Sequence, residues 1–122
     1  MRRLLLATIL LIGAIGAAHA IDFNQHVLTF DGKDFMGPDG KPVPQVLGTV
    51  AENSLLQTAA TESIEEKTKK YMLAVKIHEH PDNPNLSAEE IALIKKVIGT
   101  YQPTAIMGQA FRLIDPASTP KN

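Results

Sequence analysis

The sequence predicts a mainly α-helical fold, a small bundle of about four helices with an N-terminal β-hairpin or extended arm. Three observations lead to this prediction. Apolar residues recur at helical spacing from Val46 to Ile114, and the stretch SAEE at Ser87 is a helix-start signature. Strand and turn signals are confined to residues 21–45. The predicted parts are a signal peptide at 1–20, the hairpin or arm at 21–45, a helical domain at 46–115 and a disordered polar tail at 116–122.

The first twenty residues have the three parts of a secretory signal peptide. Arg2 and Arg3 supply the positive start, residues 4–18 form an uncharged apolar run, and the sequence AHA, ending at Ala20, places small residues where signal peptidase cleaves. The run is shorter than the roughly 20 apolar residues that span a bilayer. We therefore expect cleavage after Ala20 and export to a bacterial periplasm. An uncleaved membrane anchor is the alternative.

Cleavage would leave residues 21–122, a chain of one-domain size with a mildly acidic charge. Loss of Arg2 and Arg3 lowers the basic residues from 12 to 10 against 13 acidic residues, which gives a net charge of −3. Nucleic-acid binding depends on clustered Lys and Arg, so we expect no nucleic-acid partner. The same lack of a basic cluster argues against association with anionic membranes after cleavage. The sequence contains no cysteine, which excludes disulfides, thiol catalysis and thiolate metal sites.

Residues 21–45 carry the strand and turn signals. The alternation in HVLTF predicts a half-buried strand, with His26, Leu28 and Phe30 on one face and Val27 and Thr29 on the other. The segments DGK and PDGK predict two tight turns, because glycine tolerates positive φ and proline presets φ. The intervening KDFM is then expected to return as a short second strand. The prolines that follow disfavour regular ladder pairing.

Two helices are predicted in the first half of the helical domain. The first has apolar residues at a spacing of about 3.6, namely Val46, Leu47, Val50, Ala51, Leu55 and Ala59. The second, at about 62–78, has glutamates in its first turn and lysines later, the order that the helix dipole favours. Its apolar stripe is predicted to be Ile64, Thr68, Tyr71, Met72 and Val75, widened toward its end by Leu73, Ala74 and Ile77.

The third helix has the clearest boundaries. Ser87 and Glu90 form a capping box, in which the serine hydroxyl and the glutamate carboxylate each accept from a backbone N–H of the first turn. Gly99 is placed to end this helix in the left-handed conformation. The predicted buried face is Ile91, Ile94, Val97 and Ile98.

A fourth helix is expected to begin at Pro103, because proline is favoured at the first helical position. Gly108 inside this helix costs about 1 kcal/mol relative to alanine, which indicates close approach to a neighbouring element. The core stripe is predicted to be Ile106, Met107, Ala110, Phe111 and Ile114.

His78 and His80 are the candidate metal ligands of this chain. With His26 elsewhere and Glu79 or Asp82 nearby, they suit a His/carboxylate site for zinc or copper in an exported protein. The spacing favours a second interpretation, since two helical ligands normally lie four residues apart. In that interpretation KIHEH ends one helix, PDNPN is the turn, and the histidines lie at a helix end that the dipole favours.

Other chemistries lack their motifs in this sequence. A calcium loop starting at Asp82 would place Pro84 and Leu86 at ligand positions and Ser87 where the EF-hand needs glycine. The sequence has no G-x-S-x-G elbow, no S-x-x-K motif and no Walker phosphate loop. We therefore expect no catalytic residues and no cofactor apart from the zinc or copper alternative.

The stretch from Tyr71 to Asp115 resembles a type of small protein encoded in bacteriophage and prophage genomes. The matching motifs are LA-x-KI, LSAEEIALIKK-x-IG and Y-x-P followed by GQA and LI. The resemblance implies no assigned activity and provides no catalytic residues. Phage proteins of this type usually lack a signal peptide, and the present chain departs from them there.

Taken together, the sequence predicts an exported, non-enzymatic protein-interaction protein of phage or prophage origin. Its partner is expected to be an unidentified protein or, through self-association, a second copy of the chain. The alternative is a periplasmic metal-binding protein that uses His78 and His80.

Overall fold

The computed structural model describes residues 21–115, and the predicted signal peptide and C-terminal tail lie outside this range. Four helices and one two-stranded antiparallel sheet make up the described chain, which confirms the predicted fold class. None of the helices between residues 21 and 115 is long and apolar enough to cross a membrane. In chain order the elements are β1 (His26–Val27), β2 (Gln45–Val46), α2 (Leu47–Leu55), α3 (Ile64–Glu79), α4 (Ala88–Tyr101) and α5 (Thr104–Ile114).

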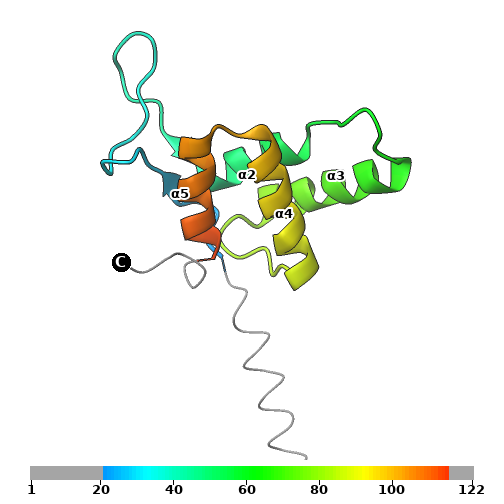
Figure 1. Ribbon diagram of the computed structural model, residues 1–122. Coiled ribbons are helices and arrows are strands. Elements are labelled where there is room, and N and C mark those ends of the chain that lie inside the picture. Colours follow the sequence, from blue (N-terminus) through cyan, green and yellow to red (C-terminus); the bar gives the residue numbers. More distant parts are fainter. Residues whose placement is uncertain (1–20, 116–122) are drawn as a thin grey trace, which may run out of the picture.

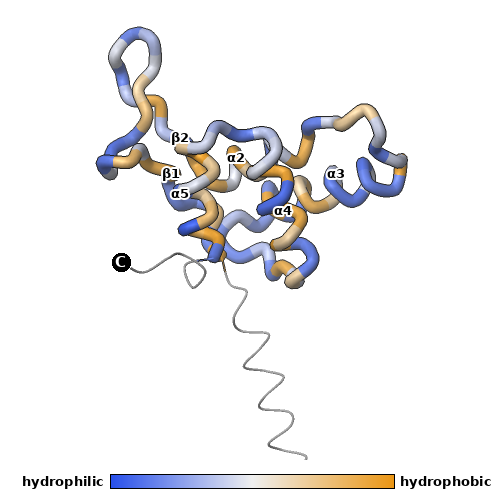
Figure 2. Tube along the Cα trace, viewed as in Figure 1, coloured by the Kyte–Doolittle hydropathy of each residue, from blue (hydrophilic) through white to orange (hydrophobic). Residues whose placement is uncertain are grey.

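Helix α2 lies at the centre of the bundle. It packs against both α3 and α4, while α5 packs against α4 and β1. Figure 1 shows α4 and α5 side by side in front of α2, with α3 extending away to one side. In Figure 2, hydrophobic and hydrophilic residues alternate along the helices, as expected for elements with one buried face. The largest fully buried side chains are Phe23, Val27, Leu47, Ser54, Leu55, Ile77, Ile94 and Ile98.

The segment before β1 is part of the core. The Phe23 side chain is fully buried, and its backbone N–H donates to the Pro81 carbonyl at 2.7 Å. Its own carbonyl accepts from the N–H of Gly48 in the first turn of α2 at 2.8 Å. Residues 21–27 therefore tie the α3–α4 connection to the start of α2.

The predicted strand at 26–30 is shorter than expected and pairs with a different segment. Only His26 and Val27 form strand pairs, opposite Val46 and Gln45, and not with the KDFM return. Of the two predicted faces, the one with Val27 points into the core, whereas Phe30 on the other face is 97% exposed.

A turn explains the early end of the strand. The Thr29 N–H donates to the Lys33 carbonyl at 2.7 Å, and Gly32 adopts φ +83° within this turn. Residues 28–44, called the projecting loop below, then extend from the bundle (Figure 1). The second predicted turn is also present, with Gly40 at φ +77°, and beside it Pro42 forms a single bridge with Met36.

Helix α3 buries the residues that were predicted to widen its apolar stripe, Leu73, Ala74 and Ile77, and leaves the main predicted stripe outside the core. The buried residues are Lys70, Leu73, Ala74 and Ile77, which lie about 3.6 residues apart. The stripe from Ile64 to Val75 that the sequence favoured lies on the opposite side. The helix begins at Ile64, two residues later than predicted, because Ser63 is the N-cap and accepts from the Glu66 N–H at 3.1 Å.

Helix α4 confirms the capping box and corrects its predicted end. Ser87 Oγ accepts from the Glu90 N–H at 3.1 Å, and the Glu90 carboxylate accepts from the Ser87 N–H at 2.9 Å. The helix continues through Gly99 to Tyr101, so Gly99 is not its C-terminal stop. Ile94, Val97 and Ile98 are buried as predicted, while Ile91 is half-buried.

Helix α5 differs from its prediction at Pro103 and Gly108. Pro103 is the N-cap and not the first helical residue. A Cβ placed on Gly108 would meet no atom within 4 Å, so the expected close approach at this glycine is absent. Ala110 and Ile114 are the buried residues of the helix, and Ile106, Met107 and Phe111 pack partly against the core.

Candidate functional site

Exposed hydrophobic side chains gather in two places on the described chain. One group is on the projecting loop and the other is on and beside α3. Contiguous exposed apolar surface on a small protein commonly marks an interaction site. The large exposed hydrophobic residues are Phe30, Met36 and Val43 on the loop, and Leu56, Ile64, Tyr71 and Met72 around α3.

The outer face of α3, defined as Ile64, Thr68, Tyr71, Met72 and Val75, forms one continuous helical stripe. Ile64 is 83% exposed, and Tyr71 and Met72 are each 59% exposed. These positions share one side of the helix because 3.6 residues make one turn. The opposite side of α3 is in the hydrophobic core. Helix α3 thus has two apolar faces, of which the bundle covers one.

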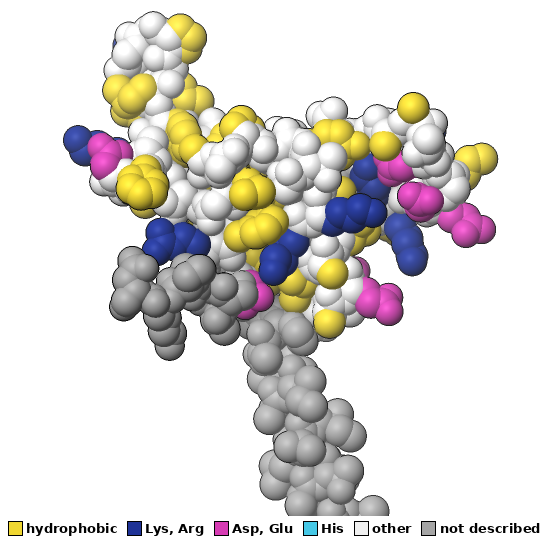
Figure 3. Space-filling model, viewed as in Figure 1, with side chains coloured by type: hydrophobic (Ala, Val, Ile, Leu, Met, Phe, Trp, Pro, Cys, Tyr) yellow, Lys and Arg dark blue, Asp and Glu magenta, His cyan; other side chains and the backbone are white. Residues whose placement is uncertain are grey.

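A groove of about 840 Å³ runs between α3 and α4 and joins the outer face to the bundle. Ile64, Met72 and Val75 line it from α3, and Leu93 lines it from α4. A neighbouring hollow of about 490 Å³ shares Leu93 with the groove and continues along α4. Figure 3 shows hydrophobic, lysine and acidic side chains together over this part of the surface. The shape suits an elongated segment with apolar anchors and a polar edge.

One ion pair fixes the distance between the groove walls near the C-terminal end of α3. Lys76 Nζ lies 3.1 Å from Glu90 Oε1, and both side chains are about one-third exposed. Burial of the Glu90 carboxyl raises its pKa, but hydrogen bonds from the Ser87 N–H and from Lys76 outweigh this, so the pKa lies below its usual value. The glutamate therefore stays charged at neutral pH and links the α4 cap to α3.

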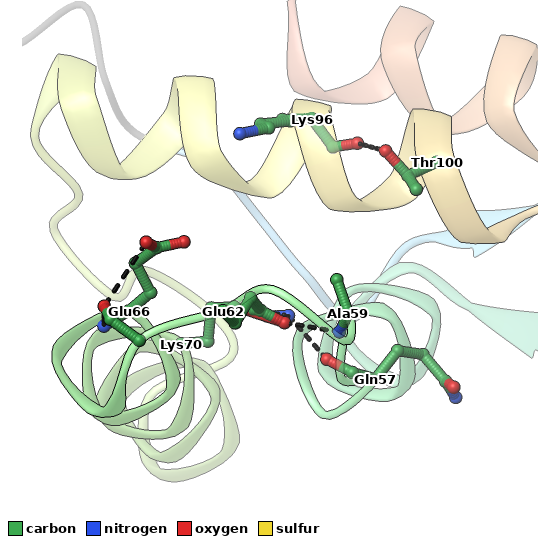
Figure 4. Close-up of polar contacts among 8 residues, drawn as sticks. Gln57, Ala59, Glu62, Glu66, Lys70, Lys96 and Thr100 are labelled. Atoms are coloured by element: carbon green, nitrogen blue, oxygen red, sulfur yellow. Dashed lines mark hydrogen bonds and ion pairs between the residues drawn. The ribbon is translucent and has the colours of Figure 1, made fainter.

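A second ion pair holds the start of α3 in place. Lys70 Nζ lies 2.9 Å from Glu62 Oε1 and also donates to the Gln57 carbonyl, while the side chains of Lys70 and Glu62 are 7% and 9% exposed. The Ala59 N–H donates to the same carboxylate at 2.7 Å. Figure 4 shows these groups meeting in the connection between α2 and α3.

The contacts among Lys70, Glu62, Gln57 and Ala59 stabilise the fold. Lys70 Nζ has its donors directed at Glu62 and Gln57 and lies 5.6 Å from the centre of the Tyr101 ring. The Ala59 hydrogen bond, followed by Lys70, lowers the pKa of Glu62. The sequence analysis did not place Lys70 on the buried face. The signal that places Lys70 on the buried face is its spacing of three and seven residues from Leu73 and Ile77, which puts all three on one side of the helix.

The structure places the predicted metal ligands at the end of α3 and in β1. His78 lies in the last turn of α3 with its Nδ1 2.7 Å from Glu52 Oε1, and its side chain is 79% exposed. His80 is the exposed residue that follows the helix, and His26 lies in β1 with its Nδ1 3.0 Å from Asp34 Oδ1. Between residues 21 and 115, no three His, Asp or Glu side chains come together in a group that could hold a metal ion.

The contact between His78 and Glu52 bears on whether His78 could bind a metal ion. A histidine that donates from Nδ1 to a carboxylate presents Nε2 outward, the arrangement usual for histidines that bind metals. Here it supplies one nitrogen on a largely exposed side chain, whereas catalytic zinc takes three protein ligands and structural zinc takes four. The zinc or copper alternative therefore stays a prediction with one oriented donor behind it.

In comparisons with known proteins, this chain matches no family model, no curated protein and no solved structure. The resemblance of Tyr71–Asp115 to small phage proteins stays a prediction.

Proposed function

We propose that this chain is an exported, non-enzymatic protein-interaction protein that binds its partner through the outer face of α3. One observation carries the proposal. Ile64, Tyr71 and Met72 form an exposed apolar stripe on a helix whose other face already packs in the core. Burial of such side chains by a partner is favourable by roughly 25 cal/mol per Å² of apolar surface, before the costs of association.

The surface beside the stripe extends the proposed binding site. Leu56, at the end of α2, and Tyr71 line the same small hollow, so the apolar surface continues from α3 onto α2. On the other side, Leu93 of α4 continues it across the groove. Helix α3 has 16 residues and is therefore about 24 Å long, enough for a partner helix of several turns to lie along it.

The polar groups around this surface support binding over catalysis. Lys70 is paired with Glu62, Lys76 with Glu90, and His78 with Glu52. Catalytic acids and bases need a site where a reacting atom lies within hydrogen-bond reach of several groups. These pairs instead connect α3 to α2, to α4 and to the α2–α3 connection.

Export is the second part of the proposal and is supported by the sequence. The first twenty residues combine Arg2 and Arg3, an apolar run and a small-residue exit, as in a secretory leader. The proposed setting is a bacterial periplasm, and a phage or prophage origin follows from the resemblance over Tyr71–Asp115. Radiolabelled pulse-chase in a bacterial host, with detection of a product shortened by the leader, tests the export step.

Site-specific photo-cross-linking tests the binding surface. A photoreactive residue at Tyr71 or Met72, in the chain produced with its own leader, is expected to give discrete protein adducts in the envelope of the host. The same residue at Ala105, an exposed position on α5, is the matched control and is expected to give none. Equal adducts from all three positions, or no adduct from Tyr71 and Met72, would contradict the proposal.

A further inference from the structure

We infer that the folded protein protects its own predicted processing site, so that removal of the leader has to precede docking of residues 21–23 onto the bundle. The inference rests on the export step of the proposed function and goes beyond it by fixing the order of that step and folding. The predicted cut lies between Ala20 and Ile21. Ile21 is thus the first residue of the processed chain and also a member of the hydrophobic core.

The residues directly after the cut are held by burial and by backbone hydrogen bonds. Ile21 is 7% exposed, and the Phe23 side chain is fully buried. The Phe23 N–H donates to the Pro81 carbonyl at 2.7 Å, and the Phe23 carbonyl accepts from the Gly48 N–H at 2.8 Å. Residues 21–23 are therefore attached to the α3–α4 connection on one side and to α2 on the other.

The backbone also turns immediately after the cut. The Asp22 carboxylate accepts from the Asn24 N–H at 2.9 Å, and the Asp22 carbonyl accepts from the Gln25 side-chain amide at 2.8 Å. A peptidase takes the residues on both sides of the bond that it cuts in an extended and exposed form. Because this segment bends at residues 23 and 24 and its apolar side chains are buried, the peptidase can cut only molecules in which the segment has opened.

Opening of residues 21–23 is unfavourable once the bundle has formed. It breaks the two backbone hydrogen bonds of Phe23 and exposes the Ile21 and Phe23 side chains to water. The fraction of opened molecules is therefore small in the folded protein, and the rate of cleavage falls with it. Before folding, this barrier to cleavage does not exist. A chain that folds first accordingly keeps its leader, which gives the uncleaved form that is the alternative to export.

A linker insertion tests whether the docked segment causes the protection. The full chain is made by cell-free synthesis without membranes, allowed to fold in nonionic detergent and treated with a purified bacterial leader peptidase. In the test variant, a flexible segment of about eight glycine and serine residues between Ala20 and Ile21 moves the cut away from the buried residues. The same segment between Asp39 and Gly40, in the second turn of the projecting loop, is the matched control.

The folded unmodified chain and the loop control are expected to be cut at least about tenfold more slowly than the linker variant. Leu47→Asp, which places a carboxylate at a fully buried position and unfolds the bundle, is expected to be cut as fast as the linker variant. Circular dichroism verifies the folded or unfolded state of each chain. Equal rates for the folded unmodified chain and the linker variant would overturn the inference.

The outcomes also separate this inference from the proposed function. Fast cleavage of the linker variant, with slow cleavage of the folded unmodified chain and the loop control, supports the inference. Cleavage of all four chains at one rate overturns it and leaves the export step in place. A linker variant as slow as the folded unmodified chain overturns it as well, because the protection would then have another origin. No cleavage of any chain, Leu47→Asp included, removes the processing site and with it both the inference and the export step.

Discussion

The side-chain amide of Gln102 donates a hydrogen bond of 2.9 Å to the hydroxyl of Ser54, joining the ends of α4 and α2 across 48 positions of sequence. Ser54 is fully buried, and its hydroxyl donates in turn to the Val50 carbonyl at 2.7 Å. The buried Ser54 hydroxyl therefore both accepts and donates a hydrogen bond, as buried polar groups require. Within the bundle, this bond fixes the position of the α4–α5 connection on α2.

Replacement of Ser54 with alanine is expected to lower the free energy of unfolding by about 1–3 kcal/mol, because the Gln102 amide loses its partner in a partly buried position. Gln102→Ala should cost a similar amount, and the double variant should cost less than the sum of the two single changes. Urea unfolding of the four proteins measures this coupling energy. Gln109→Ala, on α5, is the control. Strictly additive costs would show that the two side chains do not interact.

The lowered pKa of Glu62 predicts that the folded protein loses stability in acid. The hydrogen bond from the Ala59 N–H and the contact with Lys70 hold its pKa below the ordinary value of 4.5 in the folded protein. The unfolded chain therefore takes up the proton at a higher pH than the folded protein does. The stabilising contribution is complete above the unfolded pKa and is lost as the pH falls through the folded pKa.

Urea unfolding at a series of values between about pH 3 and pH 7 measures this contribution. Glu62→Gln is expected to unfold more easily at neutral pH and to show a flatter dependence on pH below 4.5. Part of the dependence should remain, because the pKa of Glu90 is also lowered. Glu65→Gln removes a charge three residues along the chain, in the first turn of α3, without changing the Lys70 contact and serves as the control. An unchanged slope in Glu62→Gln would contradict the assignment.

The helices could be predicted because their local signals agree with their tertiary contacts. The Ser87 capping box sets the start of α4, and the period of Ile94, Val97 and Ile98 identifies its buried face. The end of α4 was predicted wrongly because Gly99 is also compatible with a helix interior. At this position the glycine faces Phe111 of α5, whose ring lies 3.6 Å from where a Cβ would be. That contact is tertiary and leaves no local signal.

The candidate site could not be located correctly from the sequence because α3 has two apolar stripes. The stripe that contains Ile64, Tyr71 and Met72 runs along the whole helix at helical spacing, and it was therefore predicted to be the main core face. The true core face includes Lys70, a residue that sequence reasoning assigns to solvent. Its burial depends on Glu62 and on the Gln57 carbonyl, which come together only once the α2–α3 connection is folded. Leu73, Ala74 and Ile77 are buried as predicted, whereas Ile64, Tyr71 and Met72 are exposed.

Gly108→Ala is expected to stabilise the protein by about 0.5–1 kcal/mol, since a methyl group there meets no atom and the helix interior favours alanine. Gly48→Ala is the contrasting variant. Its Cβ would lie 3.1 Å from the Phe23 carbonyl oxygen, which accepts a hydrogen bond from the Gly48 N–H, so this change should destabilise. Thermal melts compare the two variants with the unmodified chain. A destabilised Gly108→Ala would mean that α5 has a close neighbour at this position.

Metal titration decides between the interaction protein and the metal-binding alternative. Because His78 and Glu52 are joined to each other and His80 lies beyond the helix end, we expect no saturable heat when Zn²⁺ or Cu²⁺ is added at micromolar protein concentration and neutral pH. Isothermal calorimetry on the unmodified chain provides the measurement, with His26→Ala as the matched histidine control. Saturable binding that disappears when His78 and His80 are both replaced with alanine, and persists in His26→Ala, would establish the metal-binding alternative. In that case the oriented Nε2 of His78 would be the first ligand to confirm, by the change in its ring proton signals on addition of Zn²⁺.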